Sequence, residues 1–323
     1  ALLQVLQEAW DPTCSERSAG VRPKRSAHQA VGQAQAYIRE GDTWVVDIDL
    51  ERFFDRVNHD VWLSRVRRRV KDRRVLTLIH RFLKAGVLTL EGSVEPTAEG
   101  TPQGGPLSPL LANLLLDEFD KELEQRGHRF ARDADDANIY VRSRQAGERV
   151  MASVTRVLER TRRLKVNEAK RAVDRPWNRT CLGFTCTARR PNRRNVSEKA
   201  LKAFNAKVRA ITGRTRGRTI GQIVKELRQL MLGWRAFFGF AEVRSPLRDL
   251  DTWIRRRLRS YHWKPWGRKR YRQLRTRGVG RQLAWNTVKS AHGPWRLSQS
   301  PALAIALPQR YFTALGLPSL IDD

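Results

Sequence analysis

Two apolar runs that end in acidic residues constrain the fold of this chain more than any other feature. The run at 43–49 is rich in β-branched residues and ends with Asp47 and Asp49, which predicts a buried strand with carboxylates at its C-terminal end. A second acidic group, Asp133-Ala-Asp-Asp136, lies between two apolar stretches at 129–142, where a tight hairpin turn would fall. The pattern therefore predicts a sheet that carries acidic side chains on separate strands.

Carboxylates on two rigid elements suit a two-metal phosphoryl-transfer centre, in which divalent ions lie about 3.5–4 Å apart. Mg²⁺ takes hard oxygen ligands and is held by few carboxylates together with substrate phosphates. One ion lowers the pKa of an attacking hydroxyl, and both stabilise charge during in-line displacement. Spacing alone leaves a simpler alternative open, because paired Asp residues are also common in polar turns without chemistry.

The charge of the chain is strongly basic and uneven. The 323 residues hold 63 Lys and Arg against 33 Asp and Glu, a formal net charge of +30. Residues 199–281 hold 24 bases and 4 acids, so a net charge of +20 lies within 83 residues. This excess argues against small-molecule metabolism as the main role. It indicates a polyanionic partner, with nucleic acid the first candidate and a membrane surface the second.

The basic part also has helical apolar spacing and six Trp between 234 and 295, so it is expected to fold. Basic side chains interleaved with aromatic ones, as at 261–270, can contact phosphates and stack on bases. RNA is favoured because splayed bases of single-stranded loops need flat partners. A solvated basic helix face or a disordered tail is the alternative.

Composition narrows the class of protein further. The chain is 40% hydrophobic, enough to bury a core, and its length suits two domains. Three Cys cannot make a disulfide framework, which fits a reducing cytoplasm. No apolar run approaches the roughly 20 residues that span a bilayer, and the first residues do not resemble a signal peptide.

Periodicity and turn residues give a coarse secondary structure. Ser108-Pro109 is expected to form the N-cap and first turn of a helix. The predicted elements are helices at 58–70, 74–84, 108–126 and 147–164, a hairpin at 87–100, short strands at 180–187, and helices after Ser197 with breaks near 213–217, 245–246 and Pro265.

Six segments in order resemble the motifs of bacterial group II intron reverse transcriptases, which are also maturases. Each segment is short, but their order and spacing together are specific, and the resemblance covers nearly the whole chain. The segments are Asp47–His59 (motif A), Thr101–Pro109 (motif B), Arg132–Tyr140 (motif C, the Tyr-x-Asp-Asp box), Leu164–Lys170 (motif D), Cys181–Phe184 (motif E, the primer grip) and Leu232–Phe238 (maturase domain X, or thumb).

The resemblance implies an α+β fold: a right-hand polymerase palm, with helices packed on an antiparallel sheet, followed by an all-α thumb. We expect the palm with partial fingers at 1–190, the helical thumb or maturase domain X at 191–285, and a C-terminal tail at 286–323. We also expect the chain to lack the N-terminal fingers segment and any endonuclease domain.

Motif positions also imply roles at the active site. Asp49, Asp135 and Asp136 would bind two Mg²⁺ ions, with the carbonyl of Leu50 beside them. Lys170 would meet the pyrophosphate leaving group, although a solvated surface Lys is the simpler alternative.

The remaining substrate contacts follow from motifs A, B and E. Phe54 would exclude a 2′-hydroxyl, unless it packs in the core beside Phe53. The resemblance assigns Gln103 and Gly104 to the incoming nucleotide and template, and it assigns Leu182, Gly183 and Phe184 to the primer end.

Further residues are expected to bind RNA. Arg22 lies in a segment that resembles a template-side stretch of the family. The basic and aromatic residues expected to contact RNA in the thumb are Arg255, Arg256, Lys264, Trp266, Arg268, Lys269 and Arg270.

One residue departs from the family pattern inside motif C. Asp133 stands where the family usually has Tyr, which places a negative charge where the primer phosphate should lie. Two functions therefore stay open: an RNA-directed DNA polymerase that is also a maturase, or a degenerate maturase that binds intron RNA without polymerising. A retron-like or defence-associated reverse transcriptase fits the Leu232–Phe238 segment less well, and a ribosomal protein would not need the acidic motifs.

The leading function implies particular partners and a setting. The partners would be group II intron RNA, an RNA template with a DNA primer, and dNTPs, with no membrane. The protein would work in a ribonucleoprotein in the bacterial cytoplasm.

Overall fold

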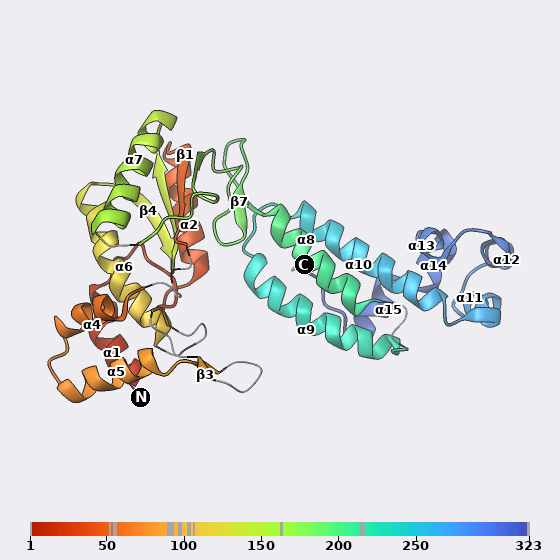
Figure 1. The fold of residues 1–323 in the computed structure, drawn as a ribbon. Coiled ribbons are helices and arrows are strands. Elements are labelled where there is room, and N and C mark those ends of the chain that lie inside the picture. The colour runs from red at the N-terminus through yellow and green to blue at the C-terminus, as the bar shows by residue number, and fades with distance from the viewer. Residues whose placement is uncertain are drawn as a thin grey trace. The chain divides into compact units, whose positions relative to one another are not determined.

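The computed structural model describes residues 2–51, 53, 57–88, 94–95, 99–101, 105, 107–161, 164–213 and 217–321. The chain divides into two compact units, Ala1–Arg193 and Arg194–Asp323, while the sequence places the boundary at 190 (Figure 1). Within the described ranges, no helix has both the length and the apolar character needed to cross a membrane.

The first unit is built on a four-stranded antiparallel sheet with the order β4-β5-β1-β6. Its registers set Asp49 opposite Asp136 and, across the hairpin turn, Asp133 opposite Asp136. The strands are β1 (Trp44–Asp49), β4 (Arg129–Asp133), β5 (Asp136–Val141) and β6 (Ala172–Asp174). This sheet confirms the predicted α+β class.

Helices cover both faces of the sheet (Figure 1). Because strand side chains alternate between faces, Val46 and Ile48 pack into the larger core, whereas Val45 packs with α2 on the other face. Gly147 of α7 lies so close to the sheet that an added Cβ would be 2.5 Å from Val173. The helices of this unit are α1 (Leu2–Trp10), α2 (Ala27–Arg39), α4 (His59–Arg67), α5 (Arg73–Lys84), α6 (Ser108–Gln125) and α7 (Arg144–Arg156).

The observed helix starts differ from two predictions. The N-cap of α6 is Leu107 rather than Ser108, because the Ser108 hydroxyl is 2.8 Å from the hydroxyl of Thr101. Helix α7 begins three residues before the predicted 147, because Ser143 caps it by accepting from the Ala146 amide. The predicted hairpin at 87–100 is represented by β2 (Val87–Leu88) paired with β3 (Val94–Glu95).

Among the residues of the second unit that the structure describes, the elements are helices apart from the short strand β8 (Arg194–Val196). Its buried side chains include Phe204, Leu227, Ile254 and Phe312, which come from helices far apart in the sequence. The helices are α8 (Glu198–Ile211), α9 (Ile220–Phe238), α10 (Ser245–Trp263), α11 (Arg270–Thr276), α12 (Arg281–Lys289), α13 (Pro294–Leu297), α14 (Pro301–Ala306) and α15 (Gln309–Ala314).

Candidate active site

The three carboxylates expected to bind metal lie at one end of the sheet. Asp49 is the last residue of β1 and Asp136 is the first residue of β5, directly opposite it. Asp135 occupies the two-residue turn between β4 and β5, beside Ala134, whose φ is 55°. The antiparallel register therefore brings together acidic residues that are 87 positions apart in the sequence.

Negative charge accumulates at this sheet end. Burial, together with the carboxylates of Asp47, Asp49, Asp135 and Asp133, raises the pKa of Asp136 to about 7. Burial also raises the pKa of Asp135 and of Asp133 above their usual values. Such a set of hard oxygen ligands suits a divalent cation, which would relieve the repulsion between the carboxylates.

Two motif D side chains hold the carboxylate of Asp49. The Lys170 ammonium lies 3.1 and 3.0 Å from its two oxygens, and the Asn167 amide donates to it at 3.1 Å. The hydrogen bond to Asp49 raises the pKa of Lys170. Within the part of the chain that the structure describes, no three Asp, Glu, His or Cys residues form a ready metal-binding group. The Asp49 carboxylate is instead taken up by Lys170 and Asn167.

Motif D is fixed to motif A through the backbone as well. The Asn167 amide donates to the Asp49 carbonyl at 2.9 Å, and the Glu51 amide donates to the Lys165 carbonyl at 2.8 Å. Leu50 forms a bridge with Val166 between these bonds, and its side chain is buried. Lys170 therefore lies beside Asp49 and pairs with its carboxylate, while its side chain is 64% exposed to solvent.

A buried arginine holds the turn that carries Asp135. Arg132 is 1% exposed, and it forms an ion pair with the fully buried Asp120 through bonds of 2.7 and 2.6 Å. Its guanidinium also donates to the Ala134 carbonyl at 2.6 Å and to the Asn113 side chain at 3.2 Å. The conformation of the turn is therefore tied to helix α6.

The backbone of Gly20 lies directly against the same turn. A Cβ at this position would be 2.3 Å from the Ala134 nitrogen and 2.4 Å from an Asp133 carboxylate oxygen, so no side chain fits. The Gly20 carbonyl accepts from the Asn113 amide at 2.9 Å. Sequence reasoning missed these contacts. One signal was available: Asn113 and Asp120 lie seven residues apart on the apolar face of a predicted helix.

The motif E segment forms a tight turn at Cys181–Phe184. The two end residues exchange backbone hydrogen bonds of 2.9 Å, and the central Leu182 and Gly183 have φ values of 52° and 81°. Positive φ at both central positions is the geometry of a type I′ hairpin turn. Phe184 is 1% exposed, while the two central residues are half-buried, so the turn has a buried anchor and an accessible tip.

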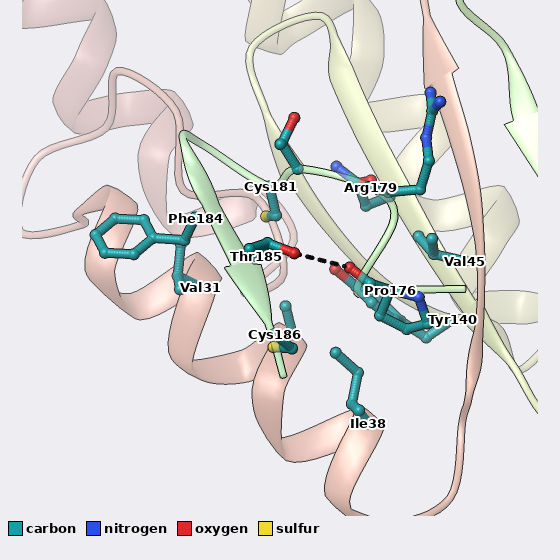
Figure 2. Close-up of a pocket in the computed structure, with 13 residues that line it drawn as sticks. Val31, Ile38, Val45, Tyr140, Pro176, Arg179, Cys181, Phe184, Thr185 and Cys186 are labelled. Atoms are coloured by element: carbon teal, nitrogen blue, oxygen red, sulfur yellow. Dashed lines mark hydrogen bonds between the residues drawn. The ribbon is translucent and has the colours of Figure 1, made fainter. Parts of the chain in front are cut away.

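An apolar pocket lies beneath this turn. Side chains of Val31 and Ile38 from α2, and of Val45 and Tyr140 from the sheet, line it together with β7 (Phe184–Cys186) (Figure 2). The Thr185 hydroxyl donates to the Pro176 carbonyl at 3.4 Å across this region. Burial raises the pKa of the Cys181 thiol, so this cysteine is not set up as a nucleophile. The pocket lining supports the turn from below.

Arg22 has a structural role in place of the expected template contact. Its side chain is 5% exposed. It donates to the Asp11 carboxylate and carbonyl at 2.8 Å each, to the Ser18 carbonyl at 2.9 Å, and also to the Ser15 carbonyl. With its donors bonded inside the protein, Arg22 holds the loop that precedes α2. Three other predicted contacts, at Phe54, Gln103 and Gly104, lie outside the described residues.

The predicted RNA-binding residues of the second unit differ in accessibility. Lys264, Arg268 and Lys269 are exposed. Trp266 is 8% exposed and packs against Trp263, with ring centroids 5.9 Å apart, so it cannot stack on a base as expected.

Three of the predicted arginines already have partners within the unit. The Arg256 guanidinium lies 3.9 Å from the centroid of the Trp295 ring, and the Arg270 guanidinium lies 4.9 Å from the centroid of the Trp263 ring. Arg255 lies 3.8 Å from the Asp251 carboxylate. All three side chains are half-buried.

Sequence comparison assigns both units. Residues 1–186 match the family described as Reverse transcriptase (RNA-dependent DNA polymerase), which covers more than half of the chain. The chain therefore belongs to this reverse transcriptase family, whose members use divalent metal ions. Residues 201–279 match the family described as Group II intron, maturase-specific domain.

Curated relatives agree with this assignment. Protein YkfC of Escherichia coli K12 is 38% identical over 130 residues, which are 39% of this chain and 34% of that protein. Group II intron-encoded protein LtrA of Lactococcus lactis is 37% identical over 130 residues, 40% of this chain and 21% of the relative. The aligned part thus spans about a third or less of these relatives. Among solved structures, apo telomerase from Candida tropicalis aligns with 99% of this chain and 61% of its own, with a TM-score of 0.49 and 11% identity.

Proposed function

We propose that this chain copies RNA into DNA by nucleotidyl transfer, and that its second unit binds group II intron RNA and assists its splicing and mobility. One observation carries the polymerase proposal: the sheet register sets Asp49 opposite Asp136, with Asp135 on the adjoining turn. The maturase match at 201–279 and the net charge of +20 at 199–281 support the RNA-binding part.

In this proposal, Asp49, Asp135 and Asp136 hold two Mg²⁺ ions, with the Leu50 carbonyl as a further oxygen ligand. When bound, the ions would acidify the primer 3′-hydroxyl and stabilise charge on the reacting phosphate. The raised pKa of Asp136 supports this role, because it reflects burial and then the neighbouring carboxylates, and a bound cation would offset both effects. Arg132, Asn113 and Gly20 would keep the Asp135 turn in place.

Lys170 would act on the leaving group. Its ammonium is beside Asp49, so it is placed to neutralise charge on the departing pyrophosphate or to donate a proton to it. The accessible tip at Leu182 and Gly183, with Phe184 as its anchor, would support the primer end. Phe54, Gln103 and Gly104 keep their predicted roles at the nucleotide.

Primer extension on an RNA template, with dNTPs and Mg²⁺, tests the polymerase proposal. The natural chain should yield DNA, and Asp135→Ala should yield none while keeping the same unfolding temperature. If neither the natural chain nor an Asp133→Tyr variant makes product, the proposal is wrong.

A second candidate function is intron RNA binding without polymerisation. Asp133 favours it, because this carboxylate is half-buried at the turn and adds negative charge where a primer phosphate would approach. An Asp49→Ala protein should then bind intron RNA as tightly as the natural chain. Binding of intron RNA no tighter than that of random RNA of equal length would contradict this candidate.

The proposed setting is a ribonucleoprotein in the bacterial cytoplasm, where the partners would be intron RNA, a template with its primer, and dNTPs. The three cysteines are free thiols, which fits a reducing compartment.

A further inference from the structure

Helix α12 presents one fully accessible polar face with a tryptophan at its centre. Gln282, Trp285, Asn286 and Lys289 follow the i, i+3, i+4, i+7 spacing of a single helix face, and all four are exposed. Trp285 is 51% exposed, although tryptophan is usually highly buried. The opposite face is the packed one, since it buries Ala284 and Thr287.

The indole of Trp285 is held in place by neighbours that leave much of it accessible. The Tyr271 ring of α11 meets it edge-on, with centroids 6.0 Å apart, and the Lys289 ammonium lies 4.8 Å from the ring centroid. On the same face, the Gln282 amide donates to the Asn286 side chain at 3.5 Å. The Trp285 ring, held by these neighbours, therefore lies between the side-chain amides of Gln282 and Asn286 and the ammonium of Lys289.

The positive charge around this face of α12 favours an anionic ligand. Residues 252–321 contain 15 Lys and Arg and no Asp or Glu, so the 70-residue stretch around α12 has no carboxylate of its own. Arg272, Arg281 and Lys289 are exposed. A protein partner would need a broader apolar patch than one indole among polar side chains. Phosphate groups match the charge, and an unpaired base matches the ring.

We propose that this face of α12 binds an unpaired RNA nucleotide: its base stacks on Trp285, Lys289 contacts an adjacent phosphate, and the Gln282 and Asn286 amides bond the base edge. A paired base in a duplex has both faces covered by its neighbours, so an exposed indole favours a splayed base. The choice of RNA rests on the function proposed for this chain. The site extends beyond the maturase match, which ends at 279.

Binding of short RNAs to the full chain tests this site. The probes are a fluorescent 12-nucleotide oligo(U) RNA, a blunt RNA duplex and oligo(dU) of the same length, measured at constant salt. Trp285→Ala should weaken oligo(U) binding about 5- to 100-fold, the range for one lost base–aromatic stack. Trp285→Phe should retain most of the affinity, and duplex binding should change less than twofold.

Leu315→Ala is the matched control, because Leu315 is an apolar residue of the same unit that is 38% exposed. It should bind all probes like the natural chain. The proposal is overturned if Trp285→Ala leaves oligo(U) binding unchanged, or if it weakens duplex binding equally. Oligo(dU) binding should fall by the same factor, because none of the proposed contacts involves the 2′-hydroxyl, and unchanged oligo(dU) binding would contradict these contacts.

These measurements need no polymerisation or splicing. A chain that makes no DNA but shows the selective Trp285→Ala loss would contradict the proposed polymerase and support this site. A chain that makes DNA but lacks the selective Trp285→Ala loss would support the proposed polymerase and contradict this site.

Discussion

The two units of this chain differ in the partners that several of their cations have. In the first unit, cations are matched with carboxylates close to the candidate active site: Arg132 with Asp120, Lys170 with Asp49, and Arg179 with Asp47. In the second unit, the guanidinium groups of Arg256 and Arg270 rest on the rings of Trp295 and Trp263, although ion pairs such as Arg218–Glu226 occur there as well.

This difference shows how one chain can gather an acidic site and still attract a polyanion. Ion pairs fix the position of carboxylates, whereas stacking on rings holds an arginine in place without cancelling its charge. The first unit thus has few cations to spare near its acids, and the second keeps its positive charge available.

The largest expected effect is a loss of primer extension that leaves RNA binding unchanged. Asp135→Ala should lower the primer-extension rate by about 10³-fold or more, because it removes a proposed metal ligand. It should leave the affinity for intron RNA unchanged, because that affinity is assigned to the other unit. Single-turnover extension and RNA binding by the same preparation give both values, and a parallel loss of RNA affinity would contradict the division.

The second largest effect should come from breaking the buried ion pair between Arg132 and Asp120, which should destabilise the first unit. Arg132→Met leaves Asp120 buried without its partner, which should cost about 3–5 kcal/mol in the free energy of unfolding. Pairing it with Asp120→Leu should restore much of that loss, because no unpaired charge remains. Urea unfolding followed by circular dichroism measures both variants. If the double variant is no more stable than the single one, the ion pair does not account for the loss.

The second unit should respond to acid through His262. Burial, and then the charge of Arg277, lower the pKa of this imidazole to about 4, and its ring nitrogen lies 2.9 Å from the Tyr311 hydroxyl. The folded state therefore favours the neutral ring. The resulting stability is complete above the unfolded pKa of about 6.5 and is lost as pH falls toward 4, by up to about 3 kcal/mol.

Thermal unfolding of the natural chain and of His262→Gln between pH 7 and pH 4 checks this dependence. The variant should show a flatter decline, because glutamine does not titrate. Equal slopes for both proteins would assign the acid sensitivity to other groups.

The smallest effect concerns the exposed bases of the second unit. Arg268→Gln and Lys269→Gln should each reduce the slope of log affinity against log salt by about 1, if each contacts one phosphate. They should weaken all RNA sequences alike. Arg270 is the comparison: because stacking on Trp263 leaves its charge available, Arg270→Gln should reduce the slope by a similar amount.

The sequence predicted the parts of the site that depend on local pattern. The strand ending at Asp49 and the turn at Asp135 can both be predicted, because a β-branched apolar run and turn residues act over a few positions. Helix α2 was missed although Ser26 and Gln29 form a capping box, since its Ala- and Gln-rich sequence lacks a strong apolar stripe. Strand β6 has three residues, too few to show a period.

Contacts between distant segments could not be read in this way. Gly20 and Asn113 are 93 positions apart, and nothing in either segment indicates that they meet beside Asp135. The same limit explains Trp266, whose basic neighbours suggested an exposed ring. The Arg277 guanidinium, from eleven positions further along, lies 5.5 Å from the centre of its ring, and Trp263 and His262 at the end of α10 also pack against it.

The backbone of Gly20 has a consequence for how mutations in this chain would be interpreted. Even the smallest side chain at position 20 would displace Asp133 or Ala134. A mutational scan of every position would therefore find Gly20 to be as intolerant of substitution as Asp135, although glycine contributes no chemical group to the reaction. Ranking positions by their tolerance of substitution alone would group a residue needed for close packing with the residues proposed to act in the reaction. Only the structure distinguishes the two kinds of residue.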